Sequence, residues 1–429
     1  MNEKELTDAS IPYSASSSND HEAHVSSSSG EFTSRSILSL LGATGAVFCT
    51  VGFQNAFGVF QTYYGESFLS NESGSDIGWI GSINIFILFS GSLVTGRILD
   101  LSGPVVMFWA GSTLTVFSLM MISLCRKYWQ FILAQAILLG IANACLVCPA
   151  VALIGQYFKK RRAVALGVTI AGSSLGGVIW PIVVHQLLQK PNIGFGWTMR
   201  IAGLIMLPIL AVSSIIARPP ILPKTMGEPL KKPAWDWTVV NTKEMLFTAS
   251  GFFLIYFGMF TPFFFTTSYA IESGFSTNLA FYTVSLINGA SLFGRILPGL
   301  VADRYGRFNL CIIMTVFSGI IALCWTTVTS AAGIVIFSLA YGFSSGGILS
   351  LQQACAAQIA TPSNMGTAVG FVMASTSLSA LAGTPVSGAL IDKYGYLSVS
   401  IYSGVSMLVG SLVLVMAKLT QNSKLLAAV

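Results

Sequence analysis

The sequence predicts an all-α integral membrane protein whose twelve transmembrane helices form two bundles of six. Its composition is the first reason: 53% of the 429 residues are hydrophobic and only 9% are charged, whereas soluble domains carry about 25% charged residues. The second reason is the spacing of the apolar runs, since a membrane-spanning helix needs about 20 apolar residues. Twelve runs have that length, at 37–61, 77–98, 104–125, 129–151, 163–188, 197–217, 245–268, 279–301, 309–327, 331–353, 366–390 and 396–418. An internal repeat is the third.

The polar segments set the predicted domains and orientation. Residues 1–36 contain eleven Ser and have no apolar core, so we expect a disordered cytosolic tail and not a signal peptide. A segment rich in Pro and charge, 218–244, divides bundle 37–217 from bundle 245–418, and 419–429 is a second tail. Sixteen of the 22 Lys and Arg residues fall on the side of the termini and five on the other. The positive-inside rule therefore predicts that both termini are cytosolic.

The repeat appears when the chain is shifted by 203 residues, which aligns Gly91 with Gly294 and Gly167 with Gly370. The shared element is G-x-x-x-D-x-x-G, at the cytosolic end of the second helix of each half. Its first Gly allows a second helix to approach, and its Asp can face the positive N-terminal end of that helix. A tight interfacial turn is the alternative, but two copies in register favour a cytosolic gate. The predicted gate residues are Gly96, Asp100, Gly103, Gly299, Asp303 and Gly306.

Arg295 is the basic residue that lies deepest inside an apolar run. It belongs to "GRILP", which resembles "GRILD" at Gly96 but lies 198 residues further on, so the two strings are out of register. By the 203-residue shift Arg97 corresponds to Leu300, and Arg295 to Ser92. A cation within the membrane usually faces a cavity or a partner, which makes Arg295 the candidate for substrate binding or gating. The alternative is that its side chain snorkels to the headgroups.

Neutral polar residues supply the other candidates. We expect Asn55, Asn143, Tyr256 and Gln352 to line a central cavity between the bundles. The segment 157–177 joins a basic cluster to a helix rich in small residues, suited either to close helix packing or to lining a cavity. Asn71 begins an N-glycosylation tripeptide on the predicted outer side.

Several classes are excluded by what the spans contain. No acid lies in the middle of an apolar run, which argues against a carboxylate proton relay, and no His/Glu or Ser/His/Asp set indicates an enzyme. Cys145 and Cys148 have a metal-like spacing but no His nearby, so we interpret them as packing residues. We expect no metal, no cofactor and no nucleic-acid partner. The expected partners are a small-molecule substrate and the lipid bilayer, with the monomer as the functional unit.

The repeat architecture resembles the major facilitator superfamily. Five stretches look more specifically like its fungal monocarboxylate-porter branch: "YFKKRRAVALGVTIAGSS" from 157, "GFGWTMRIAG" from 194, "NAFGVFQTYY" from 55, "FGRILPGLVADRYGRFN" from 293 and "GTAVGF" from 366. This resemblance implies alternating access by rocking of the two bundles around a central site. It also implies that Arg295 matches an arginine that pairs with substrate carboxylate in animal members.

The chain departs from that branch at three points. The acidic-Gly-Gly signature before the first helix is absent, no lysine stands at 57–59, and Ser291 occupies the place of an acid four residues before Arg295. These residues serve proton-coupled lactate-type transport in the animal carriers. We therefore predict a transporter that moves a small organic solute such as an organic acid or secondary metabolite, with efflux favoured. Its predicted location is the plasma membrane, with a vacuolar or other internal membrane as the alternative. A proton-linked monocarboxylate or vitamin uptake permease is the alternative, and a transporter-like nutrient sensor is the alternative of another class.

Overall fold

The computed structural model describes residues 31–190, 192–220 and 237–422. Most of the predicted tail, the centre of the predicted linker and the last seven residues lie outside this range. Throughout the described residues the secondary structure is helical, without strands. Eleven helical segments are long and apolar enough to cross a membrane, and Arg307–Leu323 is a shorter apolar helix at the place of the ninth predicted run. The predicted fold class is confirmed.

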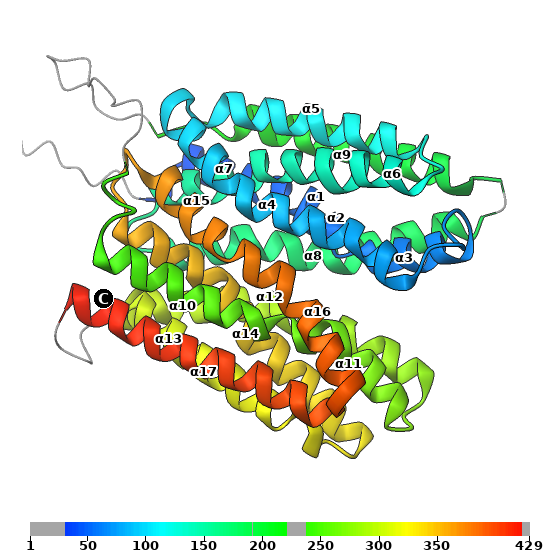
Figure 1. Cartoon of the computed structure of the whole chain (residues 1–429). Helices are drawn as coiled ribbons and strands as arrows, with labels where there is room; N and C mark the ends of the chain where they lie inside the picture. The colour runs from blue at the N-terminus through cyan, green and yellow to red at the C-terminus, as the bar shows by residue number, and fades with distance from the viewer. Residues whose placement is uncertain (1–30, 191, 221–236, 423–429) are drawn as a thin grey trace, which may run out of the picture.

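The first bundle extends from α1 to α9 (Figure 1). Its first span is broken into three helices, and its fourth contains a π-helical segment, Ile132–Leu138, between α6 and α7. The helices are α1 (Ser34–Cys49), α2 (Val51–Gln54), α3 (Phe57–Glu66), α4 (Gly74–Ser102), α5 (Pro104–Ile122), α6 (Tyr128–Phe131), α7 (Leu139–Tyr157), α8 (Arg162–Leu188) and α9 (Gly194–Ile216).

The second bundle extends from α10 to α17 (Figure 1). Two of its spans, the seventh and the eleventh of the whole chain, are each broken into two helices. The break between α10 and α11 comes just before Pro262, which lacks the N–H that a continuous helix needs. The helices are α10 (Lys243–Met259), α11 (Thr261–Glu272), α12 (Thr277–Tyr305), α13 (Arg307–Leu323), α14 (Ala331–Ile359), α15 (Met365–Ser375), α16 (Ser377–Tyr394) and α17 (Tyr396–Gln421).

Local sequence explains where the long helices begin and end. Ser73 and Ser276 cap α4 and α12, since each hydroxyl accepts a backbone N–H from the first turn. Gly103 and Gly306 end the same two helices with φ of +80° and +99°, a conformation that glycine adopts without strain. These two glycines are the last residues of the two G-x-x-x-D-x-x-G copies, so the final position of the motif is a helix stop.

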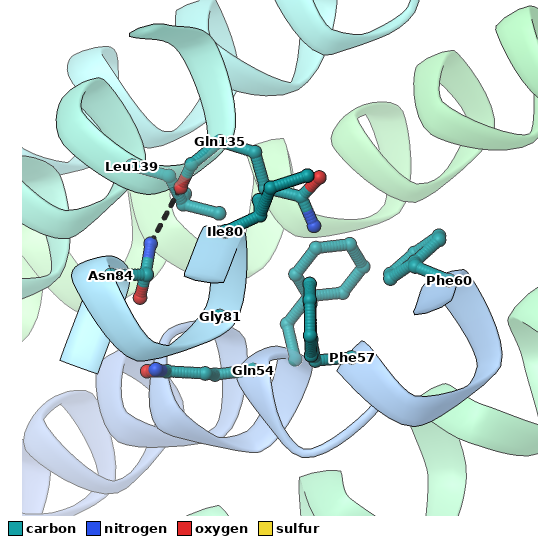
Figure 2. A pocket seen from close by; sticks show the side chains of 9 residues that line it. Gln54, Phe57, Phe60, Ile80, Gly81, Asn84, Gln135 and Leu139 are labelled. Carbon is teal, nitrogen blue, oxygen red and sulfur yellow. Dashed lines mark hydrogen bonds between the residues drawn. The ribbon is translucent and has the colours of Figure 1, made fainter. Parts of the chain in front are cut away.

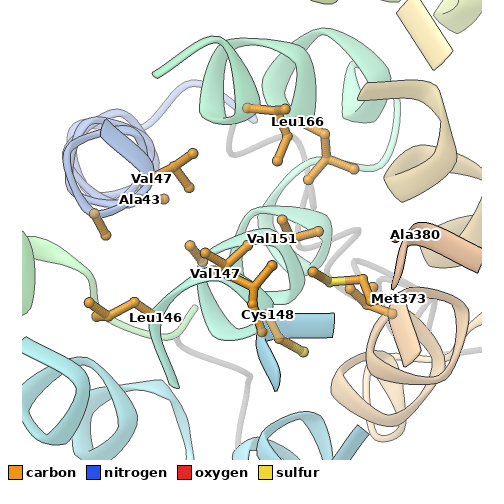
Figure 3. Close-up of a cluster of buried hydrophobic side chains, with 14 of the residues drawn as sticks. Ala43, Val47, Leu146, Val147, Cys148, Val151, Leu166, Met373 and Ala380 are labelled. Carbon is orange, nitrogen blue, oxygen red and sulfur yellow. The ribbon is translucent and has the colours of Figure 1, made fainter. Parts of the chain in front are cut away.

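Buried apolar side chains form a core that continues from one bundle into the other. Figure 3 shows α7 residues Val147 and Val151 surrounded by side chains of α1, α8 and, from the second bundle, Met373 of α15. Burial on several sides is consistent with the continuous apolar sequence of this span, which has no polar face.

The two bundles are joined mainly towards one end of the molecule. We call this the terminal end, because the start of α1 and the end of α17 lie there (Figure 1). Ser39 of α1 donates to the carbonyls of Ile216 and Arg218 at this end. Gln358 of α14 donates to Gln421 of α17. Helix α4 packs on α15 and α16, and α8 packs on α12 and α14. At the opposite end, α3 packs on α4 and α8 of its own bundle, and α11 packs on helices of its own bundle (Figure 1).

Candidate transport site and gate

The first contact between bundles at the terminal end is made by Asp100 of α4. Its Oδ1 accepts the N–H of Gly366 at 2.9 Å, and its Oδ2 accepts the N–H of Thr367 at 2.7 Å and the Thr367 hydroxyl at 2.6 Å. A Cβ on Gly96 would lie 2.1 Å from the carbonyl oxygen of Gly366. The carboxylate thus caps the start of α15, where unpaired N–H groups favour an anion, and Gly96 permits the approach.

The second contact repeats the first between α12 and α8. Asp303 Oδ1 accepts the N–H of Ala163 at 2.9 Å, and Oδ2 accepts that of Val164 at 3.0 Å. A Cβ on Gly299 would lie 2.8 Å from the Ala163 carbonyl oxygen. Acids, glycines and capped residues all correspond through the same shift of 203 residues. We call the two contacts the α4–α15 seam and the α8–α12 seam.

Basic residues extend both seams. Arg307 Nε lies 3.2 Å from Asp303 Oδ1, and its Nη2 donates to the Lys159 carbonyl at 2.7 Å. Arg97 is only 5% exposed and acts electrostatically on Asp100. Neither arginine is among the predicted gate residues, although Arg97 directly follows Gly96 and Arg307 stands four residues after Asp303, at helical spacing.

Asp303→Asn should loosen the α8–α12 seam, because an amide retains one acceptor but loses the charge that strengthens both hydrogen bonds. In a variant whose only cysteine is Cys148, which lies buried beside the Gly366 carbonyl at 3.8 Å, maleimide labelling should accelerate about tenfold. Asp392→Asn is the matched control, since Asp392 lies in a further G-x-x-x-D-x-x-G sequence, at 388–395, and is exposed. Equal labelling of the two variants would contradict a gating role for Asp303.

Glu31 fastens the start of the described chain to the loop before α8. Its carboxylate accepts three consecutive backbone N–H groups, those of Lys159, Lys160 and Arg161, at 2.9, 2.6 and 3.1 Å. Phe32 packs edge-on against Phe158 at 5.5 Å. Glu31 falls within the predicted tail, 1–36. A single acidic residue before the first helix does not predict which backbone N–H groups it will bind.

The Glu31 contact should depend on pH. Partial burial raises the pKa of the Glu31 carboxyl, but the three N–H groups outweigh it and hold the pKa below the usual 4.5. Because the folded pKa is lowered, the contact is at full strength above pH 4.5 and is lost as the pH falls through that lower value. At pH 7, Glu31→Gln should reduce hydrogen-exchange protection of the Lys159–Arg161 amides. The variant and the wild type should converge in acid, and a constant difference would contradict the assignment.

Arg295 projects from α12 across to α8 of the other bundle. Its Nη1 donates to the carbonyl of Ile170 at 2.9 Å and to the hydroxyl of Ser173. The side chain is 5% exposed, and within the described part of the chain its Nε has no hydrogen-bond partner. A Cβ on Gly167 would lie 2.1 Å from the Arg295 carbonyl oxygen. Arg295 is therefore buried between the bundles, and its guanidinium contacts α8.

Tyr256 and Gln352 lie on the second-bundle side of Arg295. The Tyr256 hydroxyl donates to Gln352 Oε1 at 2.6 Å, and Tyr256 is the group that acts electrostatically on the guanidinium. Phe89 of the first bundle packs edge-on against the Tyr256 ring at 5.8 Å. Among the described residues, Gln352 Nε2 has no hydrogen-bond partner. Buried polar atoms without partners are costly, so this cluster has unused capacity to bind a ligand.

Asn55 lies at the break in the first span and connects to Arg295 through α8. Its Nδ2 donates to the Ser173 carbonyl at 3.2 Å, and the Ser173 hydroxyl in turn contacts Arg295. The small residues of α8 serve close packing at three positions: Gly167 faces α12, Gly172 faces the Thr44 carbonyl, and Gly176 faces the Gly52 backbone.

Asn143 belongs to a different network, entirely within the first bundle. Its Nδ2 lies 3.4 Å from Asn84 Oδ1, Asn84 Nδ2 donates to the Gln135 carbonyl at 2.6 Å, and the Tyr64 hydroxyl donates to Gln135 Oε1 at 2.7 Å. Figure 2 shows Gln54, Asn84 and Gln135 around a cavity of about 20 Å³ with phenylalanine walls. That volume suits a single water molecule. The structure thus separates Asn143 from the Arg295 cluster.

Comparison with known proteins adds to this geometry. The family model described as Major Facilitator Superfamily matches residues 42–367 and 299–428. The chain belongs to the Major Facilitator Superfamily. It is 48% identical to the agnestins efflux protein of Paecilomyces divaricatus, over 93% of this chain and 90% of that protein. It is 44% identical to the aspyridones efflux protein of Emericella nidulans, over 89% and 77% of the two chains.

Solved structures support the same fold for this facilitator. A bacterial homologue of the iron transporter ferroportin in an outward-facing state matches with a TM-score of 0.70, at 12% identity, over 90% of this chain and all of that chain. The Escherichia coli fucose:proton symporter matches with a TM-score of 0.68 at 12% identity, over 89% and 98%. The chain is a multi-pass membrane transporter for a small molecule and not an enzyme. Glycosylation at Asn71, which is exposed in the turn between α3 and α4, stays a prediction.

Proposed function

We propose that this facilitator exports a small anionic secondary metabolite across the plasma membrane, as a monomer. The observation that carries the proposal is the buried Arg295 beside Tyr256 and Gln352. Its contacts with α8 are to neutral oxygens, and the group that acts on it electrostatically is the phenol of Tyr256, which is uncharged near neutral pH. A buried cation of this kind favours an anion as its ligand. The efflux activities named for the two fungal relatives support export.

The two seams form the cytosolic gate in this proposal. On the predicted orientation the terminal end is cytosolic, and its closure makes this conformation outward-facing. Opening would require Asp100 and Asp303 to leave the helix starts that they cap. Both acids are engaged there, and Ser291 stands four residues before Arg295, which supports transport without the proton-binding acid of the monocarboxylate porters. Membership of the fungal monocarboxylate-porter branch remains part of the proposal.

Metabolite profiling of cells and medium tests the direction and the substrate class. In a strain of the source organism that lacks the gene, the concentration of an exported compound should fall in the medium and rise in the cells, and the compound should be anionic near neutral pH. An uptake permease would give the opposite change, with a compound remaining in the medium. A nutrient sensor would change gene expression without altering flux in vesicles that contain only the purified protein. A neutral exported compound would contradict the role of Arg295.

A further inference from the structure

The guanidinium of Arg295 is held by the opposite bundle in the closed conformation. Its Nη1 has two acceptors on α8, the Ile170 carbonyl and the Ser173 hydroxyl. The Ser173 hydroxyl donates its own proton to the Ile170 carbonyl at 2.9 Å, which leaves its lone pairs directed at Arg295. Ser173 is 1% exposed. The serine therefore acts as an acceptor for the guanidinium, in the role that an oxygen of an anionic ligand would have.

This contact depends on the α8–α12 seam being closed. The two helices touch at Gly167, whose Cβ position lies 2.1 Å from the Arg295 carbonyl, and at Gly299 one turn further along. Asp303 holds the start of α8 in the same interface. When the bundles rock apart at the terminal end, Ile170 and Ser173 must leave with α8 while Arg295 stays with α12.

We propose that Ser173 and the Ile170 carbonyl are internal competitors for the substrate anion at Arg295. This rests on the proposed function and adds a mechanism for release. With the terminal end closed, the acceptors on α8 bind the guanidinium in place of the anion, and the anion is released. With the terminal end open, the guanidinium loses these acceptors and binds an anion from that side. Ser173 is a positioning residue in this scheme, because it acts through Arg295.

The competition makes the affinity for the anion differ between the open and the closed conformations, which favours transport in one direction. Burial of a guanidinium without acceptors is costly, so the open conformation gains free energy when an anion enters. In the closed conformation the acceptors on α8 remove most of that gain. Affinity for the anion is therefore higher in the open form and lower in the closed form, as an exporter with a cytosolic terminal end requires.

The chain offers a matched control at the next position. Ser174 is also 1% exposed, but its hydroxyl has no hydrogen-bond partner among the described residues. Ser173→Ala and Ser174→Ala remove the same atom from neighbouring buried sites, and of the two hydroxyls the structure shows only that of Ser173 hydrogen-bonded to Arg295. Any effect of lost side-chain volume should be similar in the two variants.

The experiment measures maleimide labelling of purified protein that keeps only Cys148. Salicylate is the anionic probe and salicylamide the neutral one. Ser173→Ala should label several-fold to about tenfold faster than wild type without any ligand, since one charged hydrogen bond across the seam is lost, and Ser174→Ala should label like wild type. Salicylate should accelerate labelling of wild type, salicylamide should not, and the relative acceleration should be smaller in Ser173→Ala, whose guanidinium is already less tightly held.

Each outcome decides between the two claims. If Ser173→Ala labels like Ser174→Ala, the competition is refuted, whatever salicylate does, and the proposed function stands. If Ser173→Ala labels faster but salicylate has no effect on wild type, Ser173 is only a structural tie and the competition is again refuted. The proposed function fails separately, if Arg295→Ala leaves export of the profiled metabolite unchanged.

Discussion

Valine in place of Gly370 should hold the terminal end open and reduce transport about fivefold or more, because overpacking a tight contact costs on the order of 1–3 kcal/mol. A Cβ at this position would lie 2.2 Å from the Ser92 carbonyl oxygen, and a backbone atom cannot move aside as a flexible side chain would. Gly167 makes the corresponding contact in the other seam, so Gly167→Val should act in the same way. The measurements are flux of the exported metabolite in vesicles and labelling of Cys148.

Substitutions of two glycines in α12, Gly294 and Gly289, serve as controls that separate an effect on gating from an effect on folding. A Cβ on Gly294 would lie 2.0 Å from the Phe343 carbonyl oxygen inside the second bundle, whereas a Cβ on Gly289 would have no described atom within 4 Å. Gly294→Val should therefore lower the yield of folded protein, whereas Gly289→Val should change neither yield nor flux. If Gly370→Val lowered the folded yield as Gly294→Val does, without faster labelling of Cys148, its role would be in assembly and not in closure.

Arg295→Ala should reduce export of the anionic metabolite by about thirtyfold or more, because loss of a buried charged partner costs roughly 2–5 kcal/mol. Arg295→Lys keeps the charge but not the planar fork of donors, so its flux should lie between those of wild type and Arg295→Ala. Flux in vesicles, normalised to the amount of folded protein, is the measurement.

The same variants separate binding from gating at Arg295. Arg295→Ala should also label faster at Cys148, since the tie to α8 is gone, while Arg295→Lys should retain part of both functions. Unchanged export by Arg295→Ala at normal expression would remove Arg295 from the substrate site. A neutral analogue of the metabolite, transported equally by the variant and by wild type, would locate the effect in recognition of the charge.

The helices and their pairing could be predicted because their causes are local. Apolar runs of sufficient length and a repeat with constant offset are visible in the sequence itself. The breaks at Asn55 and Thr376 were not predicted, since the residues around them continue an apolar run and tertiary contacts decide where these two helices bend. The π-helical turn was missed for the same reason.

The partners in the candidate site could be predicted only in part. The repeat identified Asp100 and Asp303 as corresponding residues, but no local pattern states which helix start each one caps. Ser173 falls in the segment of small residues, 157–177, and could not be singled out there, because its significance comes from Arg295, which lies 122 residues away. Grouping Asn143 with Tyr256 as cavity residues followed from polarity alone, and the structure assigns them to separate networks.

The 203-residue correspondence has a consequence for how such a transporter diversifies. The acids, glycines and capped helix starts of the two seams are duplicated. The residues of the candidate substrate site are not: by the same shift Arg295 corresponds to Ser92, Tyr256 to Phe53 and Gln352 to Pro149. Movement is thus encoded by the residues that the halves share, and selection of cargo by those in which they differ. Substitutions at the unshared positions can change which substrate is carried while the two seams stay intact. One scaffold can therefore acquire a new substrate without any change in the residues that open and close it.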